Sequence, residues 1–320
     1  MARTPVLVDC DTGIDDAMAL LYLLSSDTVD VVAMSTVFGN ISAETAAGNC
    51  LRVLELCGRD DVPVARGAEV PLLGYQPVLA PYVHGDDGLG NTGLPPATLP
   101  LSPLSGAELI VQTAREHPGD LHIIATGPLT NLALALAIEP RLTELVAHVT
   151  IMGGAAEAPG NETAAAEANI LHDPEGANRV LTAEWDTTLV PLDVTMREVI
   201  TDAHRARLEA AGNPIASFVV AITDFYFDFF AKDSFAERSS PVHDALAAAI
   251  AIRDVVPLVA PVVTVQVDCG WGAARGKTVA DTRGRYRGYP PIDGARCTVV
   301  LETDGTFADR LTQRFIDWPR

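Results

Sequence analysis

"PVLVDCDTGIDDAMALLYLLSS" (residues 5–26) joins an apolar run of strand length to a segment with helical spacing. The run "PVLV" (5–8) is typical of a strand buried in a parallel sheet, and "DDAMALLYLLSS" (15–26) has the apolar periodicity of a helix. The stretch therefore predicts a βα unit. Four aspartates lie within it, and a fold must explain how so much like charge is kept in one place.

The same alternation continues along the chain. Further strands are predicted at 29–37, 121–126, 148–152, 187–194, 261–267 and 297–302, and further helices at 44–58, 129–138, 197–211, 214–231, 243–253 and 307–318. Alternating strands and helices favour a parallel sheet. The predicted fold class is α/β, a single domain over residues 1–320 with a mostly parallel central β-sheet covered by helices on both faces, as in a Rossmann-like open sheet.

Two long segments lack a helix or strand period. Residues 67–104 contain seven prolines and "HGDDGLGNTG", and residues 153–170 follow a predicted strand. Loops of this length are uncommon unless they are functional or disordered. Both are expected to border a ligand cleft.

Composition excludes several classes of partner. The 320 residues are 48% hydrophobic, enough for a large core, and 42 acidic against 22 basic side chains give a net charge of −20. This charge disfavours nucleic acid polymers and anionic membranes, and no apolar run predicts a membrane span. Five scattered cysteines without a CxxC pair fit a reduced cytoplasmic location better than a disulfide framework or a zinc cluster.

The four aspartates are placed where a ligand is expected. Asp9 and Asp11 follow the first strand, and Asp15 and Asp16 begin the first helix, at the sheet edge where open α/β folds bind ligands. Two carboxylates a few Å apart repel by about 4 kcal/mol at an effective dielectric near 20, so a divalent cation is the simplest way to hold them together. Oxygen ligands suit Ca²⁺ or Mg²⁺. The alternative is structural, with Asp11 capping the helix and the other two in its first turn.

A second alternative assigns chemistry to Asp9. "DCDTG" (9–13) overlaps the Asp-x-Asp-x-Thr pattern of haloacid-dehalogenase-like phosphatases, in which the first aspartate attacks phosphorus. Here Gly13 occupies the threonine position. The phosphatase remains a weaker rival interpretation.

"DCDTGIDDAMAL" (9–20) resembles the N-terminal signature of the nucleoside hydrolases, the inosine-uridine-preferring family of N-ribohydrolases. Other segments resemble the family in order and approximate spacing: "FGN" (38–40), "HGDDGLG" (84–90), "ATGPLTNLA" (125–133), "IMGG" (151–154), "GNETAAAEANILHDPEGA" (160–177) and "VHDAL" (242–246). The resemblance covers nearly the whole chain and implies the same nucleoside hydrolase-like fold.

The resemblance implies a role for each matching residue. Asp11, Asp16, the backbone carbonyl of Thr126 and Asp244 match the positions that bind Ca²⁺, and Asp11 also matches the proposed general base. The positions that match sugar contacts are Asp15 for the 2′-hydroxyl, Asn40 and Asn169 for the diol, and Asn161 and Glu167 for the 5′-hydroxyl.

On the leaving-group side, His243 resembles the histidine that protonates the departing base, a task that suits a pKa near neutrality. His84 and Met152 match further substrate-binding positions. Two departures are noted: Thr12 replaces a common proline, and Ala168 stands where an aromatic residue is common. Ala168 is expected to widen the leaving-group side of the pocket, so the preferred nucleobase stays open.

The resemblance implies Ca²⁺-dependent hydrolysis of the N-glycosidic bond of ribonucleosides to ribose and free base, in salvage or catabolism. The expected partner is a small ribonucleoside, and the expected assembly is a homo-oligomer, a dimer or tetramer. The alternative from another class is a noncatalytic Ca²⁺-dependent ribosyl-binding protein. Such a protein would need neither the base Asp11 nor the acid His243.

Overall fold

The computed structural model describes residues 3–318 and is built on one large sheet. Its eight strands lie in the order β3 (Val64–Arg66), β2 (Val29–Thr36), β1 (Thr4–Cys10), β4 (Leu121–Ala125), β5 (Val146–Met152), β6 (Thr187–Val190), β12 (Cys297–Val299) and β9 (Val262–Val263). Neighbouring strands pair in parallel, except that β9 pairs antiparallel with β12. The predicted fold class, an α/β fold with a mostly parallel central sheet, is confirmed.

Both faces of the sheet are buried, which explains the unbroken apolar run of β1. Val6 and Val8 belong to the core on one face, and Leu7 belongs to the core on the other face. Successive side chains of a strand point to opposite faces, so a strand covered on both sides is apolar along most of its length.

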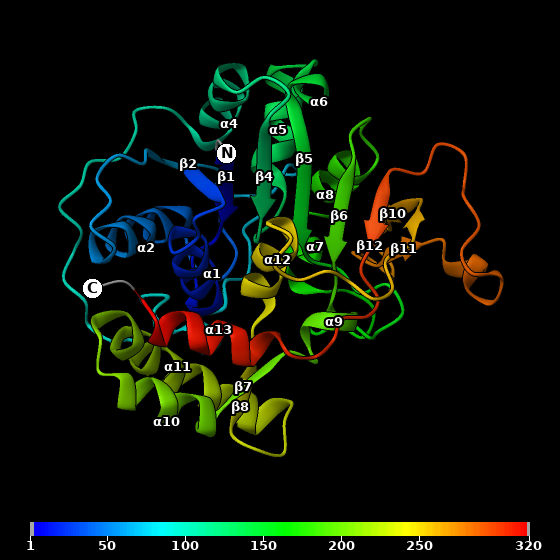
Figure 1. Ribbon diagram of the computed structural model, residues 1–320. Coiled ribbons are helices and arrows are strands. Elements are labelled where there is room, and N and C mark those ends of the chain that lie inside the picture. Colours follow the sequence, from blue (N-terminus) through cyan, green and yellow to red (C-terminus); the bar gives the residue numbers. More distant parts are fainter. Residues whose placement is uncertain (1–2, 319–320) are drawn as a thin grey trace.

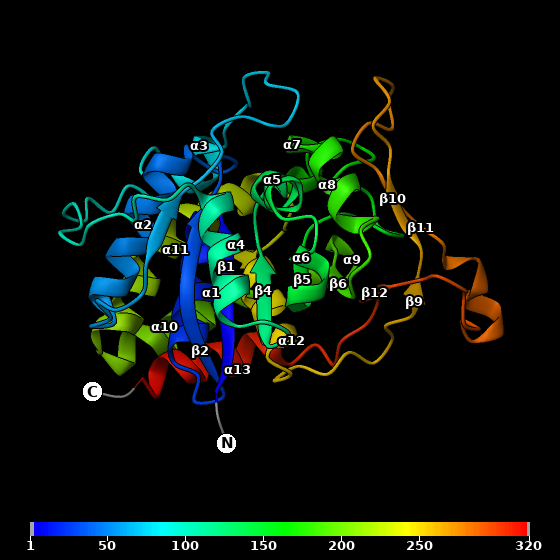
Figure 2. The same ribbon diagram turned by 90° about the horizontal axis from the view of Figure 1, so that it is seen from above.

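Helices form a layer on each side of the sheet (Figures 1 and 2). One layer comprises α1 (Ile14–Leu24), α2 (Ala43–Leu56), α10 (Asp202–Ala211), α11 (Pro214–Asp233), α12 (His243–Ala251) and α13 (Phe307–Ile316). The other comprises α4 (Gly106–Glu116), α5 (Thr130–Ile138), α6 (Leu142–Leu145) and α8 (Pro174–Leu181). The two layers are those predicted for an open, doubly covered sheet.

Short elements complete the chain. They are α3 (Pro81–His84), α7 (Ala168–His172), α9 (Leu192–Thr195), the antiparallel pair β7 (Val199–Thr201) and β8 (Ser239–Pro241), the hairpin β10 (Val265–Val267) and β11 (Thr278–Ala280), and the 3₁₀ helix η1 (Thr282–Arg287). The hairpin lies at the periphery, beyond β12 (Figure 1).

Several predicted boundaries were wrong. The helix predicted at 197–211 is β7 followed by α10, and the strand predicted at 187–194 ends at Val190, because Pro191 precedes the short helix α9. The strand predicted at 261–267 is two strands in different sheets, β9 and β10. The elements that were not predicted include β3, α4, α7 and α8.

Helix α11 has the length and apolar content of a membrane span, yet it has the surroundings of a core helix. Its buried face includes Tyr226, Phe227 and Phe230 within the core. Its outer face carries Asp224 and Asp228, which both pair with Arg238. These charges place the outer face toward water.

The strand order locates the ligand edge. From β1 the chain proceeds outward through β2 and β3, and it then returns to β4 on the other side of β1. Ligands of open α/β sheets bind at such a reversal, outside the carboxyl ends of the strands. Asp11 directly follows β1, and Thr126 directly follows β4.

Candidate active site

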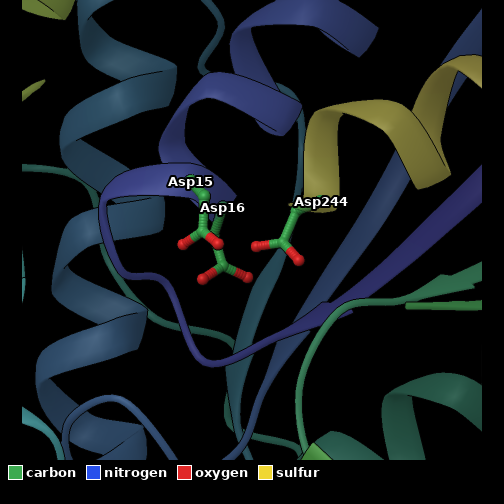
Figure 3. Close-up of side chains that lie close together, drawn as sticks. All are labelled: Asp15, Asp16 and Asp244. Atoms are coloured by element: carbon green, nitrogen blue, oxygen red, sulfur yellow. The ribbon is translucent and has the colours of Figure 1, made fainter. Parts of the chain in front are cut away.

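Three carboxylates meet beside this edge. Asp15 and Asp16 lie in the first turn of α1, and Asp244 lies in the first turn of α12, which packs against α1. One oxygen from each lies within 4.8 Å of the others. Figure 3 shows the three side chains pointing toward one another from the two helix ends. Residues far apart in the sequence thus form one acidic cluster.

Burial makes this cluster costly without a cation. Burial and the neighbouring charge raise the pKa of Asp16 to about 6, and burial raises the pKa of Asp15 to about 6. The pKa of Asp244 is raised well above its usual value, first by burial and then by the charges of Asp15 and Asp16. A cation among these oxygens would offset both effects.

Asp11 lies next to the cluster but outside this group of three. Its Oδ2 accepts a hydrogen bond of 2.7 Å from the backbone N–H of Asn40. A Cβ on Gly39 would collide with that carboxylate, so glycine permits the close approach. Burial and the charge of Asp16 raise the pKa of Asp11.

The hydrogen-bond partners of each carboxylate oxygen show which oxygens remain free to bind a metal. Oδ1 of Asp11 and Oδ1 of Asp15 are buried without a hydrogen-bond partner. Asp16 is more fully bonded: its Oδ1 accepts from Thr126 Oγ1 at 2.7 Å, and its Oδ2 accepts from the Gly13 N–H at 2.8 Å. The donor set is made of oxygen atoms, which fits a hard divalent cation.

A cavity of about 290 Å³ opens above the carboxylates. Ten of the predicted site residues border it: Asp15, Asn40, His84, Thr126, Met152, Asn161, Glu167, Asn169, His243 and Asp244. The other two, Asp11 and Asp16, are buried next to it and do not border it. The two long irregular segments both contribute to its wall, as expected from the sequence.

His243 is held by one ring nitrogen. Its Nδ1 lies 2.7 Å from Thr195 Oγ1, and the side chain is buried. Burial lowers the pKa of His243 to about 3, so the imidazole is neutral at neutral pH. If the Thr195 hydroxyl donates to Nδ1, the ring proton is on Nε2.

His84 is also held through Nδ1. Its Nδ1 accepts a hydrogen bond of 3.1 Å from the Ile14 N–H, which leaves the proton of the neutral ring on Nε2. Burial lowers the pKa of His84 to about 4. Its ring lies 5.3 Å from that of Tyr226, whose hydroxyl donates to Asp15 Oδ2 at 3.1 Å. His84 and Tyr226 therefore support the start of α1 and the Asp15 side chain.

The segment before and within α7 lines another side of the cavity. Glu167 caps α7, and its carboxylate accepts from the backbone N–H groups of Gly154, Asn169 and Ile170. Asn169 Nδ2 donates to the Thr126 carbonyl at 2.8 Å and lies 3.3 Å from the Met152 carbonyl. The Asn169 amide oxygen is thus left for the cavity. Asn161 Oδ1 accepts from the Ala168 N–H at 3.1 Å.

Comparison with known proteins shows which family the chain belongs to. The family model described as "Inosine-uridine preferring nucleoside hydrolase" matches residues 6–308. The chain belongs to this family. It is accordingly an N-glycosyl hydrolase that acts on nucleosides, as the resemblance in the sequence implied.

Individual nucleoside hydrolases agree over long stretches. A "Probable uridine nucleosidase 2" of Arabidopsis thaliana is 39% identical over 228 residues, 71% of each chain. The "Pyrimidine-specific ribonucleoside hydrolase RihA" of Shewanella woodyi is 34% identical over 317 residues, 99% of each chain. A solved plant nucleoside hydrolase, the PpNRh1 enzyme, superposes with a TM-score of 0.92 at 30% identity, covering 99% of this chain and 100% of that one.

The nucleoside hydrolase family leaves no support for the phosphatase interpretation of Asp9. Its Oδ1 accepts hydrogen bonds from Ser35 Oγ at 2.6 Å and Asn131 Nδ2 at 2.8 Å. Asp9 thus ties β1 to β2 and α5, and it does not border the cavity. Burial raises its pKa to about 6.

Sequence reasoning missed part of the cavity wall. The residues not predicted there include Tyr82, His172, Met196, Phe229 and Phe230. Thr195, the partner of His243, was also missed. The segment "TDFYFDFF" (223–230) carries a signal, since its aromatic residues recur at helical spacing, but the same spacing is typical of a core helix.

Proposed function

We propose that this nucleoside hydrolase is Ca²⁺-dependent and cleaves uridine, among ribonucleosides, to ribose and free base. The observation that carries the proposal is the buried cluster of Asp15, Asp16 and Asp244 at the floor of a nucleoside-sized cavity. The names of the relatives, uridine nucleosidase and pyrimidine-specific ribonucleoside hydrolase, support uridine as the substrate. The predicted homo-oligomeric state and cytoplasmic location are part of the same proposal.

The residues present fit a calcium ion. Asp16, Asp244 and the Thr126 carbonyl would hold it, together with the unpartnered Oδ1 of Asp11. Ca²⁺ accepts six to eight oxygens in irregular arrangements, and the sugar diol and water would complete this set. When bound, the ion lowers the pKa of a coordinated water and orients the sugar.

The chain's own residues supply the remaining chemistry. Asp11 accepts the proton of the attacking water, and Asp15 holds the 2′-hydroxyl. The free amide oxygen of Asn169 accepts a hydrogen bond from a hydroxyl of the diol. Asn40 also contacts this diol. Asn161 and Glu167 hold the 5′-hydroxyl. Carboxylates around the ribose favour the positive charge that develops on the sugar as the bond to the base breaks.

A nucleoside panel tests the proposal. Purified protein with Ca²⁺ is expected to release reducing sugar and free base from uridine with a higher kcat/KM than from inosine or cytidine. A generic phosphate ester with Mg²⁺ is expected to release no phosphate. Calorimetric binding of uridine without any turnover would instead support the noncatalytic ribosyl-binding alternative. A higher kcat/KM on inosine than on uridine would show that inosine, and not uridine, is the preferred substrate.

The free protein holds His243 neutral, with a pKa of about 3 and not near neutrality as expected from the sequence, so the acid role requires that the ring gain a proton in the substrate complex. That role predicts a dependence on the leaving group. His243→Ala is expected to lower kcat/KM on uridine by about 10²-fold to 10³-fold, the range of a general acid. With p-nitrophenyl riboside the loss is expected to stay below about 10-fold, because that leaving group departs without a proton. Equal losses of kcat/KM on the two substrates would show that His243 does not donate a proton to the leaving base.

A further inference from the structure

A second cavity, of about 280 Å³, adjoins the substrate cavity. Four residues border both: Val78, Glu162, Ala168 and His172. The far wall of the second cavity is formed by Tyr75, Trp271 and Arg275. Because the two cavities share these four residues, they lie next to each other, with the small side chain of Ala168 at their common border.

The far wall is ordered by specific contacts. The Arg275 guanidinium lies 4.1 Å from the ring centre of Trp271, and two hydrogen bonds of 2.9 Å tie Arg275 to Glu175. Tyr75 meets Trp271 edge to face at 6.4 Å. Trp271 is therefore held in place although 77% of its surface is exposed.

The near wall is fixed as well. The Tyr75 hydroxyl donates to the His172 carbonyl at 3.1 Å, and His172 Nε2 lies 2.8 Å from the Val78 carbonyl. These contacts join the segment around residues 75–78 to helix α7. An exposed, fixed indole beside a cavity is a surface on which a flat apolar group can stack.

Charge indicates what kind of group fits. Arg275 is neutralised by Glu175, and Glu162 adds a carboxyl group at the border. With a net charge of −20 for the whole chain, a phosphate or carboxylate substituent is disfavoured. A neutral aromatic group matches the Trp271 and Tyr75 rings.

The border places this cavity at one end of the substrate. Glu162 and Ala168 are sequence neighbours of Asn161 and Glu167, the proposed 5′-hydroxyl contacts. His243, proposed for the leaving-group side, does not border the second cavity, and neither do the aromatic residues of α11. Ala168 does border it, so this residue is placed here toward the 5′ end of the ribose and not, as expected from the sequence, on the leaving-group side. The second cavity thus continues from the 5′ end of the ribose.

Glu167 does not require a 5′-hydroxyl donor. Its carboxylate already accepts from three backbone N–H groups. A site rejects a substrate that lacks a hydroxyl when the missing hydroxyl leaves a buried polar group of the protein without a hydrogen-bond partner. Glu167 keeps its three backbone partners whether or not the substrate has a 5′-hydroxyl.

We propose that the cavity lined by Tyr75, Trp271 and Arg275 is a subsite for a neutral aromatic substituent on the 5′ carbon of a ribonucleoside. This inference rests on the proposed function, because the direction of the sugar comes from it. The reaction is unchanged: water adds to C1′, the bond from C1′ to the base nitrogen breaks, and the base leaves with a proton. The products are the 5′-substituted ribose and the free base.

The test compares uridine with 5′-deoxy-5′-phenylthiouridine. In the wild-type protein the two are expected to have kcat/KM values within about 10-fold. Trp271→Ala is expected to raise KM for the phenylthio compound by about 10-fold, the loss of one aromatic stacking contact and its buried area, and to leave uridine within about twofold. Tyr286→Ala is the matched control, since Tyr286 is 96% exposed and borders neither cavity.

A second variant closes the border between the cavities. Ala168→Phe is expected to reduce hydrolysis of the phenylthio compound more than hydrolysis of uridine. Binding is measured independently by quenching of tryptophan fluorescence in the Asp11→Asn protein at saturating Ca²⁺, so that weaker metal binding is not mistaken for loss of the subsite. Only the phenylthio compound should quench, and Trp271→Ala should abolish the effect. Equal changes for both substrates in Trp271→Ala, or wild-type protein that cleaves uridine and does not bind the phenylthio compound, would overturn the subsite. Failure to cleave any nucleoside would instead overturn the proposed function.

Discussion

Replacing Asp11 by asparagine is expected to lower kcat on uridine by about 10³-fold, within the range for loss of a general base. Asp11 Oδ2 accepts the Asn40 N–H, and an asparagine oxygen can keep that bond. The amide nitrogen then takes the place of the unpartnered Oδ1, where it can neither accept a proton nor bind a cation. The measurement is kcat at saturating Ca²⁺, with Ca²⁺ affinity titrated separately, so that weaker metal binding is not mistaken for loss of the base.

Asp9→Asn is the matched control for this variant. Asp9 is an equally buried aspartate two residues earlier, but its partners are Ser35 and Asn131. It is expected to keep kcat within about threefold of the wild type, because both partners donate to Oδ1 and an asparagine oxygen can accept the same two hydrogen bonds. An Asp11→Asn protein that keeps more than about a tenth of the wild-type kcat would exclude the base role, since general bases contribute more than that.

The local part of the site could be predicted from the sequence. Asp11, Asp15 and Asp16 lie within six residues at the junction of a strand and a helix, so the local pattern places them at one sheet edge. Asp244 is more than two hundred residues away. It reaches the cluster only because α12 packs against α1, a tertiary contact for which the sequence offers no local signal. The family resemblance was the source of that assignment.

The sequence also did not predict which carboxylates lie closest together in the acidic cluster. The resemblance assigned Asp11 to the ion and Asp15 to the sugar, whereas the group of three carboxylates closest to one another contains Asp15 and excludes Asp11. The difference is small in space, because Asp11 still shifts the pKa of Asp244. Which aspartates form the group depends on side-chain rotamers and on the hydrogen bond from the Tyr226 hydroxyl to Asp15. Neither can be predicted from the spacing of residues in the sequence.

Some missed elements had readable signals. Helix α4 begins with a capping box in which Ser105 and Glu108 bond reciprocally, and "SGAE" (105–108) is the corresponding sequence pattern. Helix α8 begins with Asp173 as its cap and Pro174 in its first turn. The strand β3 has three residues, too few for any periodicity. These errors left the site prediction unaffected, because none of the three elements borders the substrate cavity.

Removing Ca²⁺ is expected to abolish uridine hydrolysis and to lower stability at about pH 7 more than at about pH 5. In the metal-free protein the folded-state pKa values of Asp15 and Asp16 are about 6, above the ordinary value of 3.8. Between these values the folded chain keeps protons that the unfolded chain has released, so the free energy of unfolding falls as pH rises through this window. Above pH 6 both carboxyl groups are charged and repel each other without a cation.

Bound Ca²⁺ reverses this disadvantage, because it favours the ionised carboxylates and competes with protons. At a Ca²⁺ concentration of about 100 Kd the added stability is about 2.7 kcal/mol, which corresponds to a rise in melting temperature of about 5 °C at pH 7. The measurement is the melting temperature with Ca²⁺ and with chelator at both pH values, alongside uridine turnover with chelator and after Ca²⁺ is restored.

Two variants separate the metal effect from the general cost of buried carboxyl groups. The pKa of Asp9 is also raised to about 6, so Asp9 adds to the loss of stability with pH whether or not Ca²⁺ is bound. Asp9→Asn should therefore flatten the pH profile and keep the gain from Ca²⁺, whereas Asp244→Asn should lose that gain. Full turnover in the presence of chelator, or the same rise in melting temperature in wild-type and Asp244→Asn proteins, would show that these carboxylates do not bind the ion.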